Sequence, residues 1–137
     1  MGAKECSELL MTEELTGKKI LLVDDDEEVV EAIRAALADT GAEIDTASDG
    51  NAAVEKCLSE TPDLMVLDLM MPKRSGFLVL EKVKQGKART DPPRVVVITG
   101  NTGTRHRVWA ESLGAEAYFQ KPFRMDRLVE AITDLLS

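Results

Sequence analysis

The most constraining feature of this chain is the regular alternation of short apolar runs with longer amphipathic segments. The runs have the length of single strands and cover residues 19–24, 42–47, 63–68, 94–99 and 115–120. The segments that follow them space apolar side chains three and four residues apart, as helices do. Strict alternation of this kind is typical of a parallel sheet covered on both faces. We therefore predict an α/β fold: a doubly wound five-stranded parallel sheet flanked by five helices.

Each predicted helix has a recognisable apolar face, although the fourth, residues 104–113, is the weakest because charged residues surround its apolar ones. The apolar side chains that mark these faces are Val29, Val30, Ile33 and Leu37 in the first helix, Ala53, Val54, Cys57 and Leu58 in the second, Phe77, Leu80 and Val83 in the third, Val108, Trp109 and Leu113 in the fourth, and Leu128, Val129, Ile132, Leu135 and Leu136 in the fifth.

Size and composition narrow the class of protein. The chain has 137 residues, of which 44% are hydrophobic and 31% charged, and this fits one globular domain. We assign residues 18–137 to that domain and residues 1–17 to an N-terminal extension that we expect to be flexible. No apolar stretch is long enough for a membrane span and no secretory signal is visible, so we expect a cytoplasmic protein without a membrane partner. The net charge of −8 argues against direct nucleic-acid binding.

Side chains suited to chemistry stand at or just after the ends of four predicted strands. They are, in chain order, Asp24 with Asp25 and Asp26, then Asp68, Thr99 and Lys121. Parallel strands bring their carboxyl ends to one edge of the sheet, and open α/β sheets bind ligands there. We therefore expect these carboxylates, the hydroxyl and the ammonium group to converge.

Asp68 is the most informative of these residues because its surroundings, LMVLDLMMP at 64–72, are otherwise apolar. A buried carboxylate is costly unless it is paired, protonated or bound to a metal. Clustered carboxylates favour a hard cation such as Mg²⁺, which also accepts phosphate oxygens as ligands. Lys121 and Thr99 can contact further phosphate oxygens, and a carboxylate can accept a phosphoryl group covalently. The pattern therefore predicts a phosphoryl site with Mg²⁺ as its cofactor.

Four motifs, in this order, resemble those of the receiver domains of two-component response regulators, the CheY-like family. They are LLVDDDEEV, VLDLMMPKRSG, VVVITG and AYFQKPF, and the resemblance covers roughly residues 18–137. One such motif would be weak, but four at the ends of alternating strands are specific in combination. The resemblance implies a flavodoxin-like (βα)5 receiver fold and the role of a signalling phosphoacceptor rather than an enzyme.

The same resemblance implies roles for the acidic residues. Asp68 would receive a phosphoryl group from a sensor histidine kinase or a histidine phosphotransfer protein. Asp25, Asp68 and the backbone carbonyl of Met70 would hold Mg²⁺, with Asp24 acting largely through a metal-bound water. Met70 lacks an amide or carboxylate that could orient an attacking water, although Asn101 could do so. We therefore expect a longer-lived phosphorylated state than in relatives with a polar residue at position 70.

The resemblance to receiver domains also implies a conformational switch. Thr99 and Lys121 would contact the phosphoryl oxygens, and Gly100 would leave the path to Asp68 open. Tyr118 would turn inward as the Thr99 hydroxyl moves toward the phosphoryl group, and the bond between Lys121 and Pro122 is a candidate for a cis peptide. The readout surface would be the fourth helix, the fifth strand and the fifth helix. That surface is also the candidate homodimer interface, while the downstream partner stays unknown.

Structural explanations compete with these roles. Asp26 is expected to cap the first helix, and Thr99 or Tyr118 taken alone would be read as a cap and a half-buried strand residue. We expect no catalytic role for His106 in its charged helix. Trp109 either covers the core or marks a partner surface, and the sequence leaves both open.

Two other functions remain open. Asp24-x-Asp26 after the first strand is shared in outline with phosphohydrolases that use an aspartate nucleophile, but Glu27 and Glu28 follow and no length is spare for a cap domain. The second is a receiver-like binding module that signals without phosphorylation.

Overall fold

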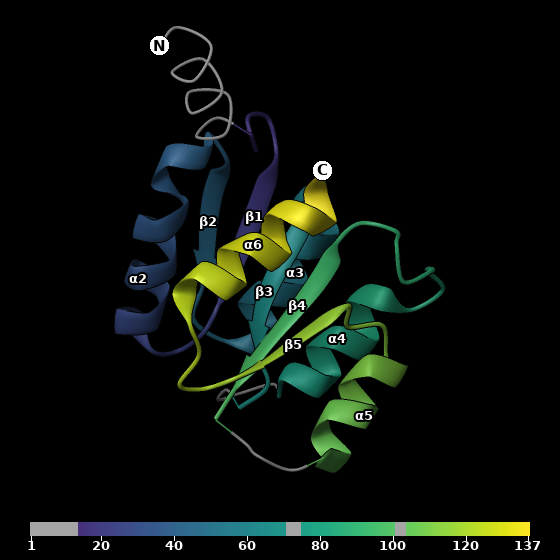
Figure 1. The fold of residues 1–137 in the computed structure, drawn as a ribbon. Coiled ribbons are helices and arrows are strands. Elements are labelled where there is room, and N and C mark those ends of the chain that lie inside the picture. The colour runs from purple at the N-terminus through teal and green to yellow at the C-terminus, as the bar shows by residue number, and fades with distance from the viewer. Residues whose placement is uncertain (1–13, 71–74, 101–103) are drawn as a thin grey trace, which may run out of the picture.

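The computed structural model of this chain describes residues 14–70, 75–100 and 104–137, and its strands form one sheet (Figure 1). The bounds of the strands are Lys19–Val23 for β1, Glu43–Ala47 for β2, Leu64–Asp68 for β3, Arg94–Thr99 for β4 and Ala117–Gln120 for β5. All pairs are parallel, in the order β2-β1-β3-β4-β5. This is the flavodoxin-like order, and the predicted fold class is confirmed.

Five α-helices connect and follow the strands within the described residues. They are α2 at Glu27–Leu37, α3 at Gly50–Glu60, α4 at Gly76–Lys84, α5 at Thr104–Ser112 and α6 at Met125–Leu136, with a short 3-10 helix at Ala38–Thr40. Helices α3, α4 and α5 pack on one face of the sheet, whereas α2 and α6 pack on the other (Figure 1). The predicted helices are therefore present, and the sheet is a middle layer between two layers of helices.

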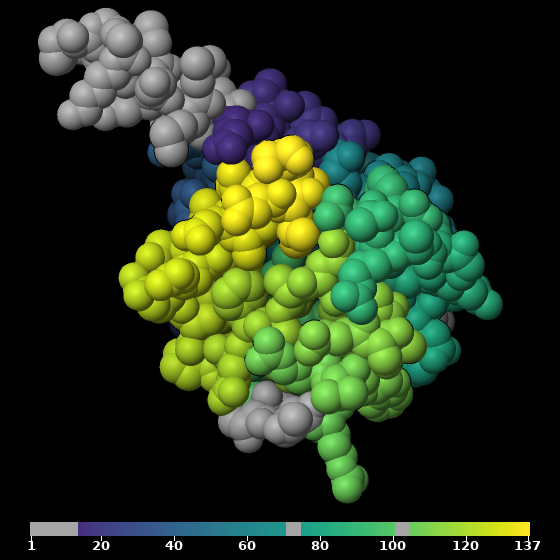
Figure 2. Space-filling view, turned by 45° about the vertical axis from the view of Figure 1, so that its right-hand side comes forward, coloured from purple at the N-terminus to yellow at the C-terminus, as the bar shows by residue number. Residues whose placement is uncertain are grey.

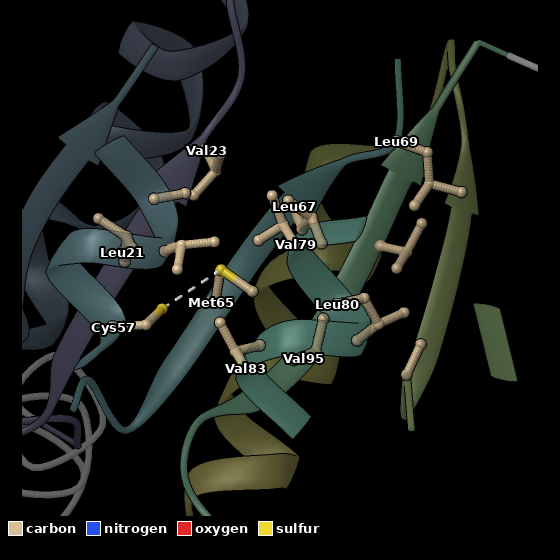
Figure 3. Packing of buried hydrophobic residues seen from close by; sticks show 14 of the residues in the cluster. Leu21, Val23, Cys57, Met65, Leu67, Leu69, Val79, Leu80, Val83 and Val95 are labelled. Atoms are coloured by element: carbon tan, nitrogen blue, oxygen red, sulfur yellow. Dashed lines mark hydrogen bonds between the residues drawn. The ribbon is translucent and has the colours of Figure 1, made fainter. Parts of the chain in front are cut away.

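The sheet is buried on both faces, which explains why its central strands read as continuous apolar runs. Alternate residues serve the two cores: Leu21 faces α3, α4 and α5, whereas Leu22 faces α2 and α6. Figure 3 shows the first of these cores, where the thiol of Cys57 donates to the sulfur of Met65 at 3.7 Å. Burial raises the pKa of Cys57 to about 12, so the thiol stays protonated. Cys57 is the small buried side chain that its helical spacing predicts.

Helix caps begin the helices immediately after the strand ends. The Asp26 carboxylate accepts a hydrogen bond from the backbone N–H of Glu28 at 3.0 Å, so the predicted N-cap is confirmed. Ser75 caps α4 in the same way, accepting from the N–H of Leu78 at 3.4 Å. Each cap satisfies a backbone donor that the first helical turn leaves free.

Three side chains differ from expectation. Val108, an apolar residue of the fourth predicted helix, is 61% exposed, because α5 turns Ala110 rather than Val108 toward the core. Leu58, predicted on the buried face of α3, is 63% exposed, so that prediction is wrong. Ala53, Val54 and Cys57 complete the buried stripe, and one further step of about 100° carries the next residue out of it. Leu15 lies in the segment predicted as a flexible extension but is fully buried against the core on the α2 and α6 side. Residues 1–13 lie outside the described part of the chain, so their flexibility stays a prediction.

In the described part of the chain, none of the helices has the length and apolar character needed to cross a bilayer.

Candidate functional site

The candidate site lies at the carboxyl edge of the sheet, where parallel strands deliver their last residues together. Asp24 follows β1, Asp68 ends β3 and Thr99 ends β4, and all three are buried. Strand β3 lies between β1 and β4, and Asp68 pairs with Ile98, the neighbour of Thr99. The order of the strands therefore places the two buried carboxylates on adjacent strands, with the hydroxyl-bearing residue beside them.

Three carboxylates form the centre of the site. One oxygen from each of Asp24, Asp25 and Asp68 can be chosen so that all three lie within 4.8 Å of one another. Asp24 and Asp68 are buried, whereas Asp25 is exposed, so the cluster borders solvent. Three oxygen donors converging with solvent on one side match the needs of Mg²⁺, which binds one or two carboxylates and retains waters. The donor set therefore fits this ion.

Hydrogen bonds hold the buried carboxylates in place. The N–H of Asp26 donates to Oδ1 of Asp24 at 2.9 Å, and the N–H of Met70 donates to Oδ1 of Asp68 at 3.0 Å. The ammonium of Lys121 donates to Oδ2 of Asp24 at 2.8 Å and lies 3.6 Å from Oδ2 of Asp68. Lys121 thus bridges the carboxylates at the ends of two neighbouring strands, with the closer contact to Asp24.

The environment makes ionisation of Asp68 unfavourable. Burial raises the pKa of this carboxyl to about 6, and the nearby charge of Asp24 adds to the effect, although the N–H of Met70 and the ammonium of Lys121 oppose it. For Lys121, burial works against the charged form, but the hydrogen bond to Asp24 and the charge of Asp68 outweigh it and raise the pKa. The site therefore contains a firmly charged ammonium beside a carboxylate that an added cation would stabilise.

Comparison with known proteins places this geometry in a family. The sequence profile of the response regulator receiver domain matches residues 20–133, most of the chain. The chain belongs to the response regulator receiver domains.

Curated relatives of this receiver domain are longer proteins. The transcriptional regulatory protein DltR of Streptococcus agalactiae is 39% identical over 114 residues, which cover 83% of this chain and 50% of DltR. The alkaline phosphatase synthesis transcriptional regulatory protein PhoP of Bacillus subtilis is 39% identical over 106 residues, covering 77% of this chain and 43% of PhoP. The receiver domain thus spans about half the length of the curated relatives it matches.

Solved structures agree with the fold. A CheY-like receiver domain protein of Methanospirillum hungatei has a TM-score of 0.77 at 28% identity, covering 87% of this chain and 93% of that one. The chemotaxis response regulator CheY4 of Vibrio cholerae has a TM-score of 0.78 at 27% identity, covering 88% of this chain and 100% of that one. The predicted receiver fold is confirmed.

The structure also locates the expected switch residues. The N–H of Lys121 donates to the carbonyl of Thr99 at 2.7 Å, and the peptide bond between Lys121 and Pro122 is cis, as predicted. An added Cβ at Gly100 would meet no atom within 4 Å, so there is space beside that residue. Met70 is exposed. Asn101 and residues 71–74 lie outside the described part of the receiver domain.

Tyr118 sits on β5 opposite Val97 and packs against the core on the α3, α4 and α5 side. Its hydroxyl is buried and has no hydrogen-bond partner among the described residues. Burial raises the pKa of this phenol, and the guanidinium of Arg107 lies 5.8 Å from the ring centroid. A buried hydroxyl without a partner costs free energy, so this position of the Tyr118 side chain carries an unfavourable contribution.

Sequence reasoning missed how α4 begins against the turn that carries Asp68. A Cβ on Gly76 would lie 2.4 Å from both the carbonyl oxygen of Asp68 and the Cα of Leu69, so only glycine fits there. The N–H of Gly76 also donates to the carbonyl of Leu69 at 2.9 Å. The Ser75-Gly76 pair ahead of an apolar helix was the available signal, since it marks a capped helix start close to the chemistry.

An aromatic stack, also missed, joins α4 to α5. The Phe77 ring lies 4.1 Å from the Trp109 ring at an interplanar angle of 14°, and 5.4 Å from the His106 ring at 27°. Trp109 is nevertheless 51% exposed, so it both covers the core and contributes to the surface. His106 therefore has a packing role in this structure.

Proposed function

We propose that Asp68 accepts a phosphoryl group, in a reaction that needs Mg²⁺, from a sensor histidine kinase or a histidine phosphotransfer protein. The observation that carries this proposal is the buried Asp68 carboxylate, which lies in a cluster with Asp24 and Asp25 and within 3.6 Å of the Lys121 ammonium. Among the described residues Asp68 has no close ion pair of its own, since the Lys121 ammonium lies nearer to Asp24 than to Asp68, and this supports a role in phosphoryl chemistry over a structural one.

Individual residues of the chain have different roles in the proposed phosphoryl transfer. Ionised Asp68 attacks the phosphorus of the donor, so that the phosphorus–nitrogen bond of the phosphohistidine breaks as a phosphorus–oxygen bond to Asp68 forms. Its Oδ1 is held by the N–H of Met70, which leaves Oδ2 for the attack. Lys121, close to that oxygen, stabilises the negative charge of the incoming phosphoryl group, and Thr99 donates to one of its oxygens.

The residues that would hold the metal are Asp25, Asp68 and the carbonyl of Met70, with Asp24 acting through a water. Bound Mg²⁺ supplies positive charge that offsets the carboxylates and the phosphoryl oxygens. The protein's part is to fix these oxygens: Asp24 is tied by the N–H of Asp26 and by Lys121. We propose that the receiver domain acts as a signalling phosphoacceptor in the cytoplasm rather than as a general enzyme.

Phosphorylation is read out through a second position of Thr99 and Tyr118. Thr99 moves toward the phosphoryl group, and Tyr118, whose hydroxyl has no partner among the described residues, turns into the space beside it. The affected face comprises α5, β5 and α6, which would contact the downstream partner or a second copy of the chain. Two curated relatives are named as transcriptional regulatory proteins, and this supports a transcriptional output of the signal.

The lifetime of the phosphorylated state depends on position 70 in this proposal. Met70 offers no hydrogen-bonding side chain to orient water near Asp68, so we expect slow hydrolysis. Replacing it by asparagine should speed the loss of the phosphoryl group by about tenfold or more. An unchanged dephosphorylation rate in Met70→Asn would show that position 70 does not control it.

The direct test is intact mass after incubation with acetyl phosphate, with and without Mg²⁺. We expect one added phosphoryl group that requires the metal and is lost in Asp68→Asn but kept in Asp39→Asn, which removes an exposed carboxylate elsewhere. No addition under conditions that label a known receiver would favour a phosphorylation-independent binding module. Continuous release of phosphate that depends on Asp24 but not Asp68 would instead indicate a phosphohydrolase.

A further inference from the structure

Charge is segregated along this acidic chain. Residues 76–116, which run from α4 to the start of β5, contain seven Lys and Arg residues and four Asp and Glu residues. The rest of the chain contains 10 Lys and Arg residues and 21 Asp and Glu residues. A region with a positive balance inside a protein of net charge −8 attracts acidic partners and repels basic ones.

The same region carries most of the exposed apolar side chains. Within the described residues five large hydrophobic side chains are exposed, and three of them lie in this region: Leu78 on α4, and Val108 and Trp109 on α5. The other two are Leu58 on α3 and Met70 just after β3. Figure 2 shows the teal and green residues of this region adjoining on one side of the molecule. Apolar and basic groups therefore share one surface.

Trp109 is a preorganised part of this surface. Its ring is held nearly parallel to that of Phe77, which is itself buried, so the indole loses little freedom on binding. Arg105 is four residues earlier on α5, hence on the same side of the helix, and it is exposed. Aromatic and arginine side chains in such a setting are typical centres of protein interfaces.

A groove of about 790 Å³ adjoins these groups. Leu78 and Leu113 contribute apolar walls, and Lys82 and Lys87 are exposed lysines of its lining, with Glu81 as the one acidic residue among the described residues of the lining. The Lys87 ammonium also donates to the carbonyl of Pro92 at 3.1 Å. A third lysine, Lys84, lies beneath and is not available for a ligand.

Lys84 instead builds the rim of the groove. Its buried ammonium donates to the carbonyls of Arg89, Asp91 and Pro93 at 3.0, 2.7 and 3.2 Å. These three bonds fix the loop between α4 and β4, which carries Lys87. The groove therefore has a fixed wall on this side.

We propose that this surface, defined by Leu78, Lys82, Lys87, Arg105 and Trp109, docks an acidic amphipathic segment of a partner protein. The basic groups match acidic side chains, and the exposed leucine and indole match the apolar face of the segment. A nucleic acid would use the charges but leave the apolar anchors without a role. The surface lies on the α4 side of α5, away from the β5 side where the guanidinium of Arg107 lies over the Tyr118 ring, and its binding of a partner does not require phosphorylation of Asp68.

The probes are two short helical peptides with the same leucine positions, one carrying glutamates and the other lysines at the polar positions. Binding to the whole chain is followed by the fluorescence of its single tryptophan, Trp109, and by calorimetry. We expect the glutamate peptide to bind at least about tenfold more tightly than the lysine peptide. The paired change Lys82→Glu and Lys87→Glu should remove this preference, and Leu78→Ser should weaken binding of the glutamate peptide.

A matched control places the same charge change elsewhere, with Lys18→Glu and Arg34→Glu, and should leave binding within about twofold. Equal binding of the two peptides, or an equal effect of the control pair, would overturn the proposal. A short DNA duplex that binds as tightly and depends on Lys82 and Lys87 but not Leu78 would overturn it in favour of a polyanion site. The apparent molecular mass of the chain in solution tests for self-association. If it rises with protein concentration and the Lys82 and Lys87 changes prevent this rise, the occupant of the surface is a second copy of the chain and not a partner protein.

Discussion

Asp68→Asn should stabilise the metal-free protein at neutral pH, although it removes the proposed phosphoacceptor. Burial raises the pKa of Asp68 from 3.8 to about 6. That difference corresponds to a cost of about 3 kcal/mol for keeping the ionised carboxylate folded. Asparagine has nearly the same shape and no charge, so it relieves this cost.

The pH dependence follows from the direction of the pKa change. Below about pH 3 the Asp68 carboxyl is largely protonated in both folded and unfolded chains, so its ionisation costs little. Between the two pKa values the folded chain binds the proton more tightly, and the stability of the natural protein falls as pH rises. Above about pH 7 both states are ionised and the full cost is present. The gain from Asp68→Asn should therefore grow from under about 1 kcal/mol at about pH 4 to about 3 kcal/mol at about pH 8.

Urea unfolding in the presence of a chelator, measured across this pH range for the natural chain and the variant, gives the difference directly. Asp39→Asn removes an exposed carboxylate and should show no comparable trend. Added Mg²⁺ should reduce the advantage of Asp68→Asn, because the ion stabilises the natural carboxylate cluster. If the free energies of unfolding of the natural chain and Asp68→Asn differ by the same amount at pH 4 and pH 8, the ionised carboxylate at position 68 is not destabilising and the reasoning is refuted.

Other substitutions test the neighbouring structure. Gly76→Ala should cost at least about 2 kcal/mol in urea unfolding, because its Cβ would meet backbone atoms of the turn after β3, whereas Gly100→Ala should be nearly neutral. Lys84→Met should lower the free energy of unfolding by about 3 kcal/mol, because it leaves three carbonyls without their shared donor. Lys82→Met, at an exposed position, should change it by less than about 0.5 kcal/mol. Equal effects of the two substitutions would refute the structural role of the buried Lys84 ammonium. Phe77→Leu should shift the emission of the single tryptophan to longer wavelength and lower stability by about 1 kcal/mol, and an unchanged spectrum would contradict the stack.

Much of the fold could be predicted because local patterns determine it. Strands buried on both faces read as apolar runs, and helices carry periodic stripes, so both kinds of element were found with small errors at their ends. Leu58 was misplaced because it stands one residue beyond the stripe that ends at Cys57, where spacing alone does not separate inside from outside. The order of the strands came from the family resemblance, since alternation of strands and helices fits more than one order.

The site was predictable for a related reason. Residues at the ends of parallel strands must meet, so Asp24 and Lys121 could be brought together across 97 residues of sequence. The sharing of Lys121 between two carboxylates, with the shorter contact to Asp24, depends on side-chain geometry that no pattern contains. Lys84 reads in sequence as a solvated lysine among others, and only the fold of the following loop shows that its ammonium is enclosed by carbonyls.

The most direct test of the proposed site is a crystal structure of the chain with Mg²⁺ and beryllofluoride, a mimic of the phosphoryl group. We predict beryllium bonded to the Asp68 carboxylate, Mg²⁺ held by Asp25 and Asp68, and the Lys121 ammonium moved from Asp24 toward a fluoride. Beryllofluoride bound to another side chain, or no uptake with Mg²⁺ present, would contradict the assignment of Asp68 as the phosphoacceptor.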